Sequence, residues 1–396
     1  IAAIALGVVL TFRGSGVVNL ANGAVAMYAA YAYAVLRSDG DLFLPPLPNP
    51  LALVEGLVHP FQDDDAFDLP DLPTAISFGP NMQFWPALLI ALCMCVLLGL
   101  ALHFLVFRPL RHAPPLAKVV ASIGVFLFLQ AIVIHRFGST PRSVGAMAFV
   151  DKSRVDIGPI SISQEQLFVT LLVVACTVAL WAVFRFTQFG LATRAAAENE
   201  RGAVVLGYSA DVLAGVNWVL STTITGLLGI FVASVNSNVD PWVIPALIVP
   251  ALTAALVGGF RSFGLATLTA FLLGMQLPVV QYLGVAKDWY PKVDGLAIPG
   301  VDTLLPLLLI VVVLYVRGNA LPGRGAEESG RLPFAPTPGR TSLVVVGPVA
   351  VVLTLVASLF WLDPASRAGV ANSLVGVVLC LSVVVVTGYV GQLALA

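Results

Sequence analysis

The feature that most constrains this chain is a series of apolar runs, many of them close to 20 residues long, separated by short polar segments. Hydrophobic residues make up 59% of the chain and charged residues only 10%, and the mean hydropathy is +0.96. Ordinary soluble domains carry about 25% charged residues. Because a helix needs about 20 apolar residues to cross the hydrocarbon core of a bilayer, we predict an all-α, polytopic transmembrane helical bundle.

The lengths of the apolar runs set the expected spans. They are 1–12, 16–36, 84–107, 118–135, 166–184, 211–235, 242–258, 264–283, 302–316, 342–361 and 368–388. The runs 242–258 and 302–316 are short for a full crossing. Prolines crowd the first of these two, which favours a broken or tilted helix. The chain begins and ends inside apolar runs, so we expect a fragment cut at both ends.

The basic residues predict the orientation of the spans, because cytoplasmic loops are enriched in Lys and Arg. With 108–118, 185–207, 258–264 and 317–340 in the cytoplasm, the spans alternate without conflict, and twelve of the 20 basic residues lie on that side. The segment 38–80 has eight acidic residues and no Lys or Arg. We therefore expect 38–80 on the outside, as a solvated acidic loop rather than a calcium site.

Charge and cysteine usage exclude several classes of function. The net charge of −1 gives no sign of a nucleic-acid partner. All four cysteines lie inside apolar runs, where small core residues are expected rather than a disulfide or a metal site. The residues suggest no cofactor, no metal ion and no catalytic group.

The segment 317–341 differs from the rest of the chain because glycine, proline and charged residues dominate it. This composition is typical of a flexible linker. Apolar runs resume directly after it, which predicts a unit over 1–316, a cytoplasmic linker and the start of a second, truncated unit over 342–396. A weak repeat between 6–23 and 381–396, in the same membrane sense, indicates a parallel repeat, with chance similarity as the alternative.

The segment 188–207 is small-residue-rich and charged in an otherwise apolar chain. Arg194, the alanines that follow it and Glu198 favour a helix, and Gly207 is suited to end one. A short amphipathic helix along the cytoplasmic face would offer a docking site for a soluble partner. The alternative is a simple charged connector.

Several motifs, in order along the chain, resemble the permeases of branched-chain amino acid ABC transporters. They are Val17-Val18-Asn19-Leu20-Ala21-Asn22-Gly23, Arg108-Pro109-Leu110-Arg111, Ser122-Ile123-Gly124, Thr187-Gln188-Phe189-Gly190, Val257-Gly258-Gly259-Phe260-Arg261 and Gly388-Tyr389-Val390-Gly391-Gln392-Leu393. The general coupling-loop pattern of ABC importers has Glu-Ala-Ala-x-x-x-Gly, and here Arg201 stands in place of the acid. The last motif resembles the opening signature of the second permease of such transporters.

The resemblance implies a multi-pass permease in the bacterial inner membrane, which is itself no enzyme. It implies cytoplasmic ABC ATPase subunits, a periplasmic or extracellular substrate-binding protein, a second permease unit and surrounding membrane lipid as partners. The residues assigned to the ATPase-coupling loop are Arg194, Ala195, Glu198, Arg201, Ala203 and Gly207. Branched-chain amino acids are the expected substrates, with urea, amides and other small solutes left open.

Polar residues inside the spans are candidates for a translocation path, because such groups cost free energy in lipid unless they are satisfied. They are Asn19, Asn22, Asn217, Asn236 and Gln392. Hydrogen bonding between helices is the equal alternative. For His103 and His135, near span ends, we expect snorkelling to the interface rather than a proton relay.

The main rival function is an ion-coupled secondary transporter, which would need acidic residues near the bilayer midplane. Asp211 and Asp240 lie at span ends instead. A membrane enzyme is a third class, but no spacing gathers the four histidines.

Cutting the linker tests the predicted division into two units. We expect a single protease cut within 320–338 to leave both blocks folded and associated with the membrane, because an exposed linker contributes little to either fold. Gel filtration and thermal unfolding of the nicked protein check this. Loss of assembly after a clean cut would argue against two separable units.

Overall fold

The computed structural model describes only part of the chain. The described residues are 1–43, 75–79, 82–113, 115–145, 147, 150, 153–157, 160–198, 200–286, 292–293, 296–297 and 301–317, with single residues between 348 and 374. The chain divides into two units, Ile1–Ala326 and Glu327–Ala396, and nearly all of the described residues belong to the first. The predicted linker, the spans 342–361 and 368–388 and the second half of the predicted repeat lie almost wholly outside the described residues.

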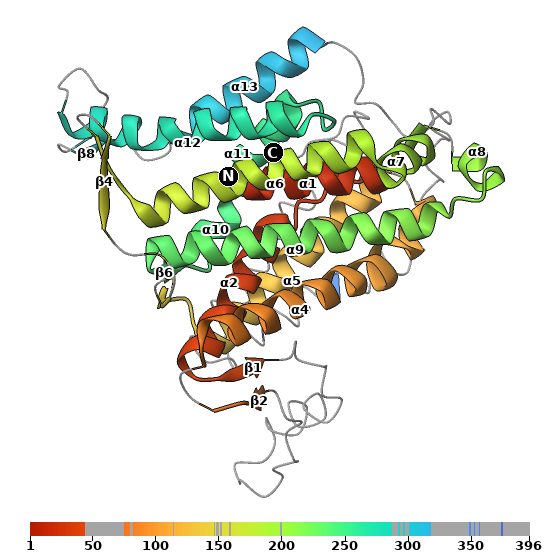
Figure 1. The fold of residues 1–396 in the computed structure, drawn as a ribbon. Coiled ribbons are helices and arrows are strands. Elements are labelled where there is room, and N and C mark those ends of the chain that lie inside the picture. The colour runs from red at the N-terminus through yellow and green to blue at the C-terminus, as the bar shows by residue number, and fades with distance from the viewer. Residues whose placement is uncertain are drawn as a thin grey trace, which may run out of the picture. The chain divides into compact units, whose positions relative to one another are not determined.

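The first unit is a bundle of helices, which confirms the predicted all-α fold (Figure 1). The helices are α1 (Ala2–Ser15), α2 (Asn22–Ser38), α4 (Phe84–Ala101), η3 (Leu102–Phe107), η4 (Pro109–His112), α5 (Pro115–Phe137), α6 (Gln164–Phe186), α7 (Gln188–Glu198), α8 (Glu200–Val205), α9 (Ala210–Asn236), α10 (Val243–Ala246), α11 (Ile248–Val257), α12 (Phe263–Ala286) and α13 (Val301–Arg317). Within the described residues, five helices are long and apolar enough to cross a membrane, and α1, α10–α11 and α13 are shorter apolar helices.

The predicted break in the run 242–258 is present between α10 and α11, at Leu247. Pro250 explains it, because a proline has no N–H to donate to the carbonyl four residues earlier and its ring crowds that carbonyl. The predicted span 16–36 was wrong at its start, since α2 begins only at Asn22. Gly16 ends α1 with a φ of 69° and donates its N–H to the carbonyl of Phe12 at 2.8 Å. A left-handed glycine of this kind is a common helix end.

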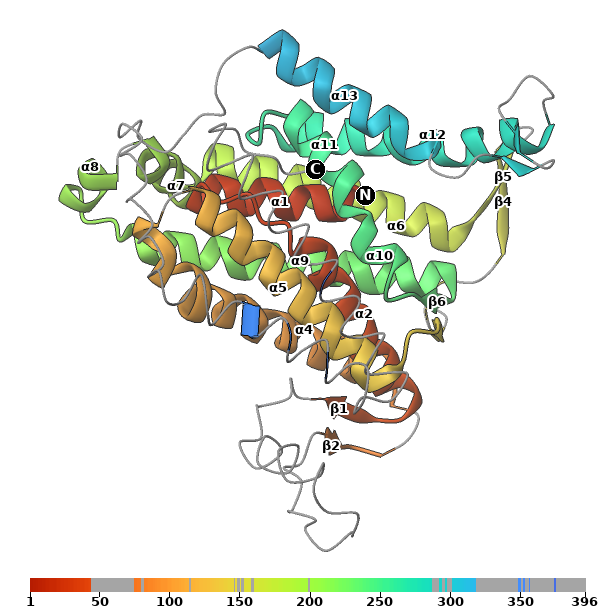
Figure 2. The same ribbon diagram turned by 180° about the vertical axis from the view of Figure 1, so that it is seen from behind.

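Helix α9 packs along α1, α2 and α4, and Figures 1 and 2 show it running beside them. Glycines allow this close contact. A Cβ on Gly7 of α1 would lie 2.2 Å from Oγ1 of Thr225, and one on Gly14 would lie 2.3 Å from Cβ of Asn217. Lipid tails are as apolar as side chains, so helices in a membrane associate mainly through such close packing and through buried hydrogen bonds.

Within the described part of the chain, four short antiparallel strand pairs lie at the helix ends away from α7 and α8 (Figure 1). They are β1 (Asp41–Phe43) with β2 (Ala75–Ser77), β3 (Arg142–Ser143) with β6 (Asn238–Val239), β4 (Arg154–Ile157) with β5 (Ile160–Ser163), and β7 (Lys292–Val293) with β8 (Leu296–Ala297). The segments 108–113, 187–198, 200–209 and 258–262 lie at the opposite ends of the long helices. This arrangement agrees with the alternation of spans inferred from the basic residues.

Cysteine labelling tests which end faces the cytoplasm. In a variant without the native cysteines, we expect Asp64→Cys to react with an impermeant thiol reagent in intact cells and Ala113→Cys to react only after the membrane is opened. The reason is that Arg108, Arg111 and Lys118 mark the cytoplasmic end. Labelling of position 113 but not 64 in intact cells would reverse the orientation.

Candidate functional site

The segment predicted to form a short helix over 190–207 is helical over α7 and α8, which lie at one end of the bundle (Figure 1); residue 199, between them, is outside the described residues. Thr187 caps α7, because its hydroxyl accepts the N–H of Gly190 at 3.2 Å. Gly207 has a φ of 85° and follows α8, and the N–H of Tyr208 bonds to the carbonyl of Ala203 at 3.0 Å. A glycine supplies this left-handed conformation without strain.

The inner face of α7 and α8 is made of alanines. Ala192, Ala196 and Ala203 are buried, together with Ala210 and Leu213 at the start of α9. The side chain of Ala203 is only 2% exposed, so its small size serves the packing of the chain on itself. These contacts fix α7 and α8 to the start of α9.

Glycine also allows α7 to fold back on α6. A Cβ on Gly190 would lie 2.4 Å from Cα of Phe184 and 2.5 Å from its carbonyl oxygen. Real Cβ atoms almost never approach backbone atoms this closely. The position of α7 therefore depends on the absence of a side chain at residue 190.

What we call the outer face of α8 consists of exposed apolar residues at the end of α8 and of Leu206 just after it. Val204, Val205 and Leu206 are 56%, 87% and 73% exposed. Arg194 and Gly207 are exposed as well, and Ala195 is half-buried. Glu198 and Arg201 lie in α7 and α8, but their side chains are outside the described part. A run of exposed apolar residues beyond the end of the bundle is typical of a protein–protein contact surface.

A charged cluster clamps the start of α9 to the end of α4. Nε2 of His103 lies 3.3 Å from Oδ1 of Asp211, and Nε of Arg108 lies 3.1 Å from Oδ2 of Asp211. His103 is 4% exposed, so the expected snorkelling of this residue was wrong. It sits in η3, a π-helical turn; such turns occur frequently at functional sites. His135 is exposed, as snorkelling requires.

Two of the predicted path residues meet in a fully buried polar cluster. Nδ2 of Asn19 donates to Oδ1 of Asn22 at 3.0 Å, and the hydroxyl of Ser221 lies 3.4 Å from the same oxygen. Ser221 also donates to the carbonyl of Gly7 at 2.9 Å. The cluster therefore joins the loop before α2, the start of α2, α1 and α9.

Asn217 lies on the same face of α9, four residues before Ser221, and Thr225 follows four residues after it. Asn217 donates to the carbonyl of Leu213 at 2.7 Å, within its own helix. Together with Asn22, these residues form what we call the polar seam, which runs along the contact between α1 and α9. Asn236 is exposed at the end of α9 and lies outside the seam, and Gln392 is outside the described residues.

Some buried polar atoms of the seam have no hydrogen-bond partner among the described residues. They are Nδ2 of Asn22, Oδ1 of Asn217 and Oγ1 of Thr225. Leaving such a group unpaired costs about 1–3 kcal/mol each. Buried groups left unpaired at this cost need an explanation, and binding of a polar ligand is one.

Sequence reasoning missed Ser221, Thr225 and the clamp. The spacing of Asn217, Ser221 and Thr225 at intervals of four is the signal that one helix face is polar. No comparable signal links His103 to Asp211, because they are far apart in the chain and only the packing of α4 on α9 brings them together.

The family model for the permease component of branched-chain amino acid transport systems matches residues 1–314. Among curated proteins, the high-affinity branched-chain amino acid permease LivH of Escherichia coli K12 is 25% identical over 45% of this chain and 58% of its own length. The corresponding protein BraD of Pseudomonas aeruginosa is 23% identical over 58% of this chain and 71% of its own length.

A probable branched-chain amino acid permease LivH of Methanocaldococcus jannaschii is 22% identical over 83% of this chain and 90% of its own length. The chain thus covers a little over half of the enterobacterial relatives, at 58% of their length, and most of the archaeal one. No solved structure matches the chain.

The contact of α7 with α6 gives a testable consequence. We expect Gly190→Ala to lower the thermal unfolding midpoint in detergent, because an added methyl group must displace the backbone of Phe184, and overpacking of this kind costs about 1–3 kcal/mol. Gly124→Ala in α5 is the matched control, since a Cβ there meets nothing within 4 Å. Equal midpoints for the two variants would show that α7 is not held at this glycine.

Proposed function

Because the chain belongs to the family of permease components of branched-chain amino acid transport systems, we propose that it is the transmembrane permease of an ATP-driven ABC importer. Its substrates would be branched-chain amino acids or similar small polar solutes. The match over residues 1–314, together with the exposed outer face of α8, is the observation that carries the proposal. ATP hydrolysis would take place in separate cytoplasmic subunits.

The outer face of α8 is the proposed contact with an ATPase subunit. Val205 and Leu206 present apolar side chains at the end predicted to be cytoplasmic, while the alanines beneath them hold α8 to the bundle. Apolar residues at the centre of an interface commonly carry most of its binding energy. Of the residues assigned to the coupling loop, Arg194 and Gly207 are exposed on this end, and Ala203 would act by positioning α8.

Motion of the ATPase would reach the membrane part through α9. The turn 206–209 joins α8 to α9, and the start of α9 is capped by Ser209 and held by the pairing of Asp211 with His103 and Arg108. A rigid helix pulled at one end moves along its whole length, and such displacement of packed helices is a known way to switch access. The polar seam lies on this same helix.

The seam is the proposed translocation path. Asn22, Asn217 and Thr225 each present a buried polar atom without a partner, so a polar solute entering between α1 and α9 would meet donors and an acceptor that are already desolvated. The seam residues are 0% exposed, so the proposed path is closed to solvent in this conformation. Opening would require α9 to move relative to α1.

The proposal includes partners that lie outside the described residues. A substrate-binding protein would deliver the solute at the outer end, and a second permease unit, beginning near residue 342 after the linker 317–341, would complete the pore. The division of the chain between Ala326 and Glu327, inside that linker, supports two separate units. The end of the family match at residue 314 agrees with it.

An ion-coupled secondary transporter is the alternative class. Among the described acidic residues, Glu165 is the most buried, at 6% exposure. It lies in the first turn of α6, close to the strand pair β4–β5, and therefore at a helix end rather than near the midplane. The described part of the chain thus gives no specific observation in favour of ion coupling.

Charged substitutions on the outer face of α8 test the coupling role. We expect Val205→Glu and Leu206→Glu each to lower co-purification of the ATPase subunits and ATP-dependent uptake of leucine by at least about tenfold, because burying an unpaired carboxylate in an interface costs several kcal/mol. Both positions are exposed, so the membrane part should fold and insert normally.

The matched control is Ile76→Glu in β2, an exposed apolar residue at the other end of the bundle with 47% exposure. It should leave co-purification of the ATPase unchanged. If Val205→Glu retains the ATPase and transports at the parental rate, α7 and α8 are only a connector between spans.

A further inference from the structure

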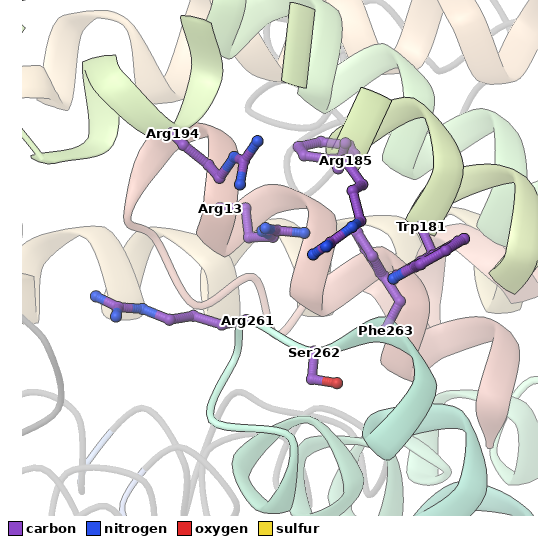
Figure 3. A pocket seen from close by; sticks show the side chains of 8 residues that line it. Arg13, Trp181, Arg185, Arg194, Arg261, Ser262 and Phe263 are labelled. Carbon is purple, nitrogen blue, oxygen red and sulfur yellow. The ribbon is translucent and has the colours of Figure 1, made fainter. Parts of the chain in front are cut away.

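A basic pocket with a volume of about 210 Å³ lies where α1, α6, α7 and α12 meet (Figure 3). Four arginines line it, together with Trp181 and Ser262; they are Arg13, Arg185, Arg194 and Arg261. The space far exceeds the about 10–15 Å³ that one water molecule needs. It lies at the end of the bundle that carries α7, which is the predicted cytoplasmic end.

The positive charges around this pocket are not neutralised by the described part of the chain. No described carboxylate lies within 4.0 Å of any of the four guanidinium groups. Arg13, Arg185 and Arg194 extend toward a common space, whereas Arg261 extends to one side (Figure 3). Nε of Arg194 donates to the carbonyl of Gly190 at 3.3 Å, which leaves its terminal nitrogens available.

Arg13 is held in place by aromatic rings rather than by an acid. Its guanidinium carbon lies 4.7 Å from the ring centre of Phe184 and 5.0 Å from that of Phe263. Arg13 lies past the apolar run that ends at residue 12. Its guanidinium stays charged at neutral pH, as an arginine side chain does in proteins.

Helix dipoles offset only part of the positive charge of the four arginines. Arg13 and Arg185 lie in the last turns of α1 and α6, where the helix end carries about half a negative charge. Two such ends offset about one of the four positive charges. Ser262 caps the start of α12, since its hydroxyl accepts the N–H of Leu265 at 3.3 Å, and that helix end adds positive potential.

An apolar surface leads away from the pocket along two helices. On α6 the exposed side chains recur at helical spacing as Leu171, Val174, Val178 and Trp181. On α12 they recur with the same spacing as Leu265, Leu268, Leu272 and Met275. The two helices are in contact, because the hydroxyls of Thr177 and Thr267 lie 2.9 Å apart. Trp181 is 49% exposed and belongs both to the pocket and to the apolar surface.

We propose that the basic pocket binds the phosphate of an anionic phospholipid headgroup, with the acyl chains along the exposed side chains of α6 and α12. Basic pockets between helices at the cytoplasmic side suit anionic headgroups, and tryptophan is enriched at this depth of the membrane. The apolar surface favours a lipid over a soluble anion. A soluble anion would contact only the arginines and would leave the apolar side chains of α6 and α12 without a role. The proposal is independent of the transported substrate.

Native mass spectrometry of the purified full chain, titrated with phosphatidylglycerol or phosphatidylcholine, tests this site. We expect tighter binding of phosphatidylglycerol, and about fivefold weaker binding for Arg185→Gln and for Arg194→Gln, whose side chains extend toward the common space, from the contribution of one basic residue near an anionic headgroup. Arg154→Gln, in β4 at the other end of the bundle, is the matched control and should bind like the parent. Arg13 is left intact because its stacking on two rings supports the fold.

Five results would overturn the proposal. Equal binding of the two lipids, or unchanged phosphatidylglycerol binding in both variants, would remove the headgroup site. An equal loss in Arg154→Gln would indicate attraction to overall charge. Displacement of the lipid by millimolar inorganic phosphate would assign the pocket to a free anion. Exclusion of the lipid by the assembled ATPase subunits would assign it to a contact with an acidic protein segment.

Discussion

The packing of α9 against α1, α2 and α4 is the interaction on which the rest of the described bundle depends. In lipid, apolar burial does not drive helices together, so association relies on close approach and hydrogen bonds. A Cβ on Gly229 would lie 2.8 Å from the carbonyl oxygen of Ala26, and Thr222 donates its hydroxyl to the carbonyl of Cys95 at 2.9 Å. These contacts bring backbones together along most of α9 and place its polar face inside.

The same helix connects the proposed sites. Its start follows α8 after the turn 206–209, and Asp211 ties that start to His103 and Arg108 just after α4. Its middle carries Asn217 and Ser221 of the polar seam. A displacement at the outer face of α8 therefore has a direct mechanical route to buried polar groups. The basic pocket is lined by Arg194 of α7 and Arg185 of α6, so a bound lipid would set the position of α7 relative to α6.

The charged segment 188–207 could be found from its composition alone, but the use of each residue in it could not. The sequence does not show which of these residues are buried. Ala203 faces the bundle, whereas Val205, two residues later, faces away from it. A helical period tells which residues share a face, and only the neighbouring helices decide which face is buried. The same holds for His103. A histidine near the end of a span either extends to the membrane interface or pairs with an acidic residue, and the neighbouring helix decides which of the two occurs.

By itself, the sequence determined the all-α fold, the approximate positions of the long apolar helices and the break near Pro250. These follow from local rules, since a backbone in lipid must satisfy its own hydrogen bonds and proline cannot. Only the tertiary structure decided that Asn22 meets Ser221, that Asp211 meets His103, and that Arg13, Arg185, Arg194 and Arg261 line one pocket. These residues come from distant parts of the chain, and their contacts depend on how closely glycines let the helices approach.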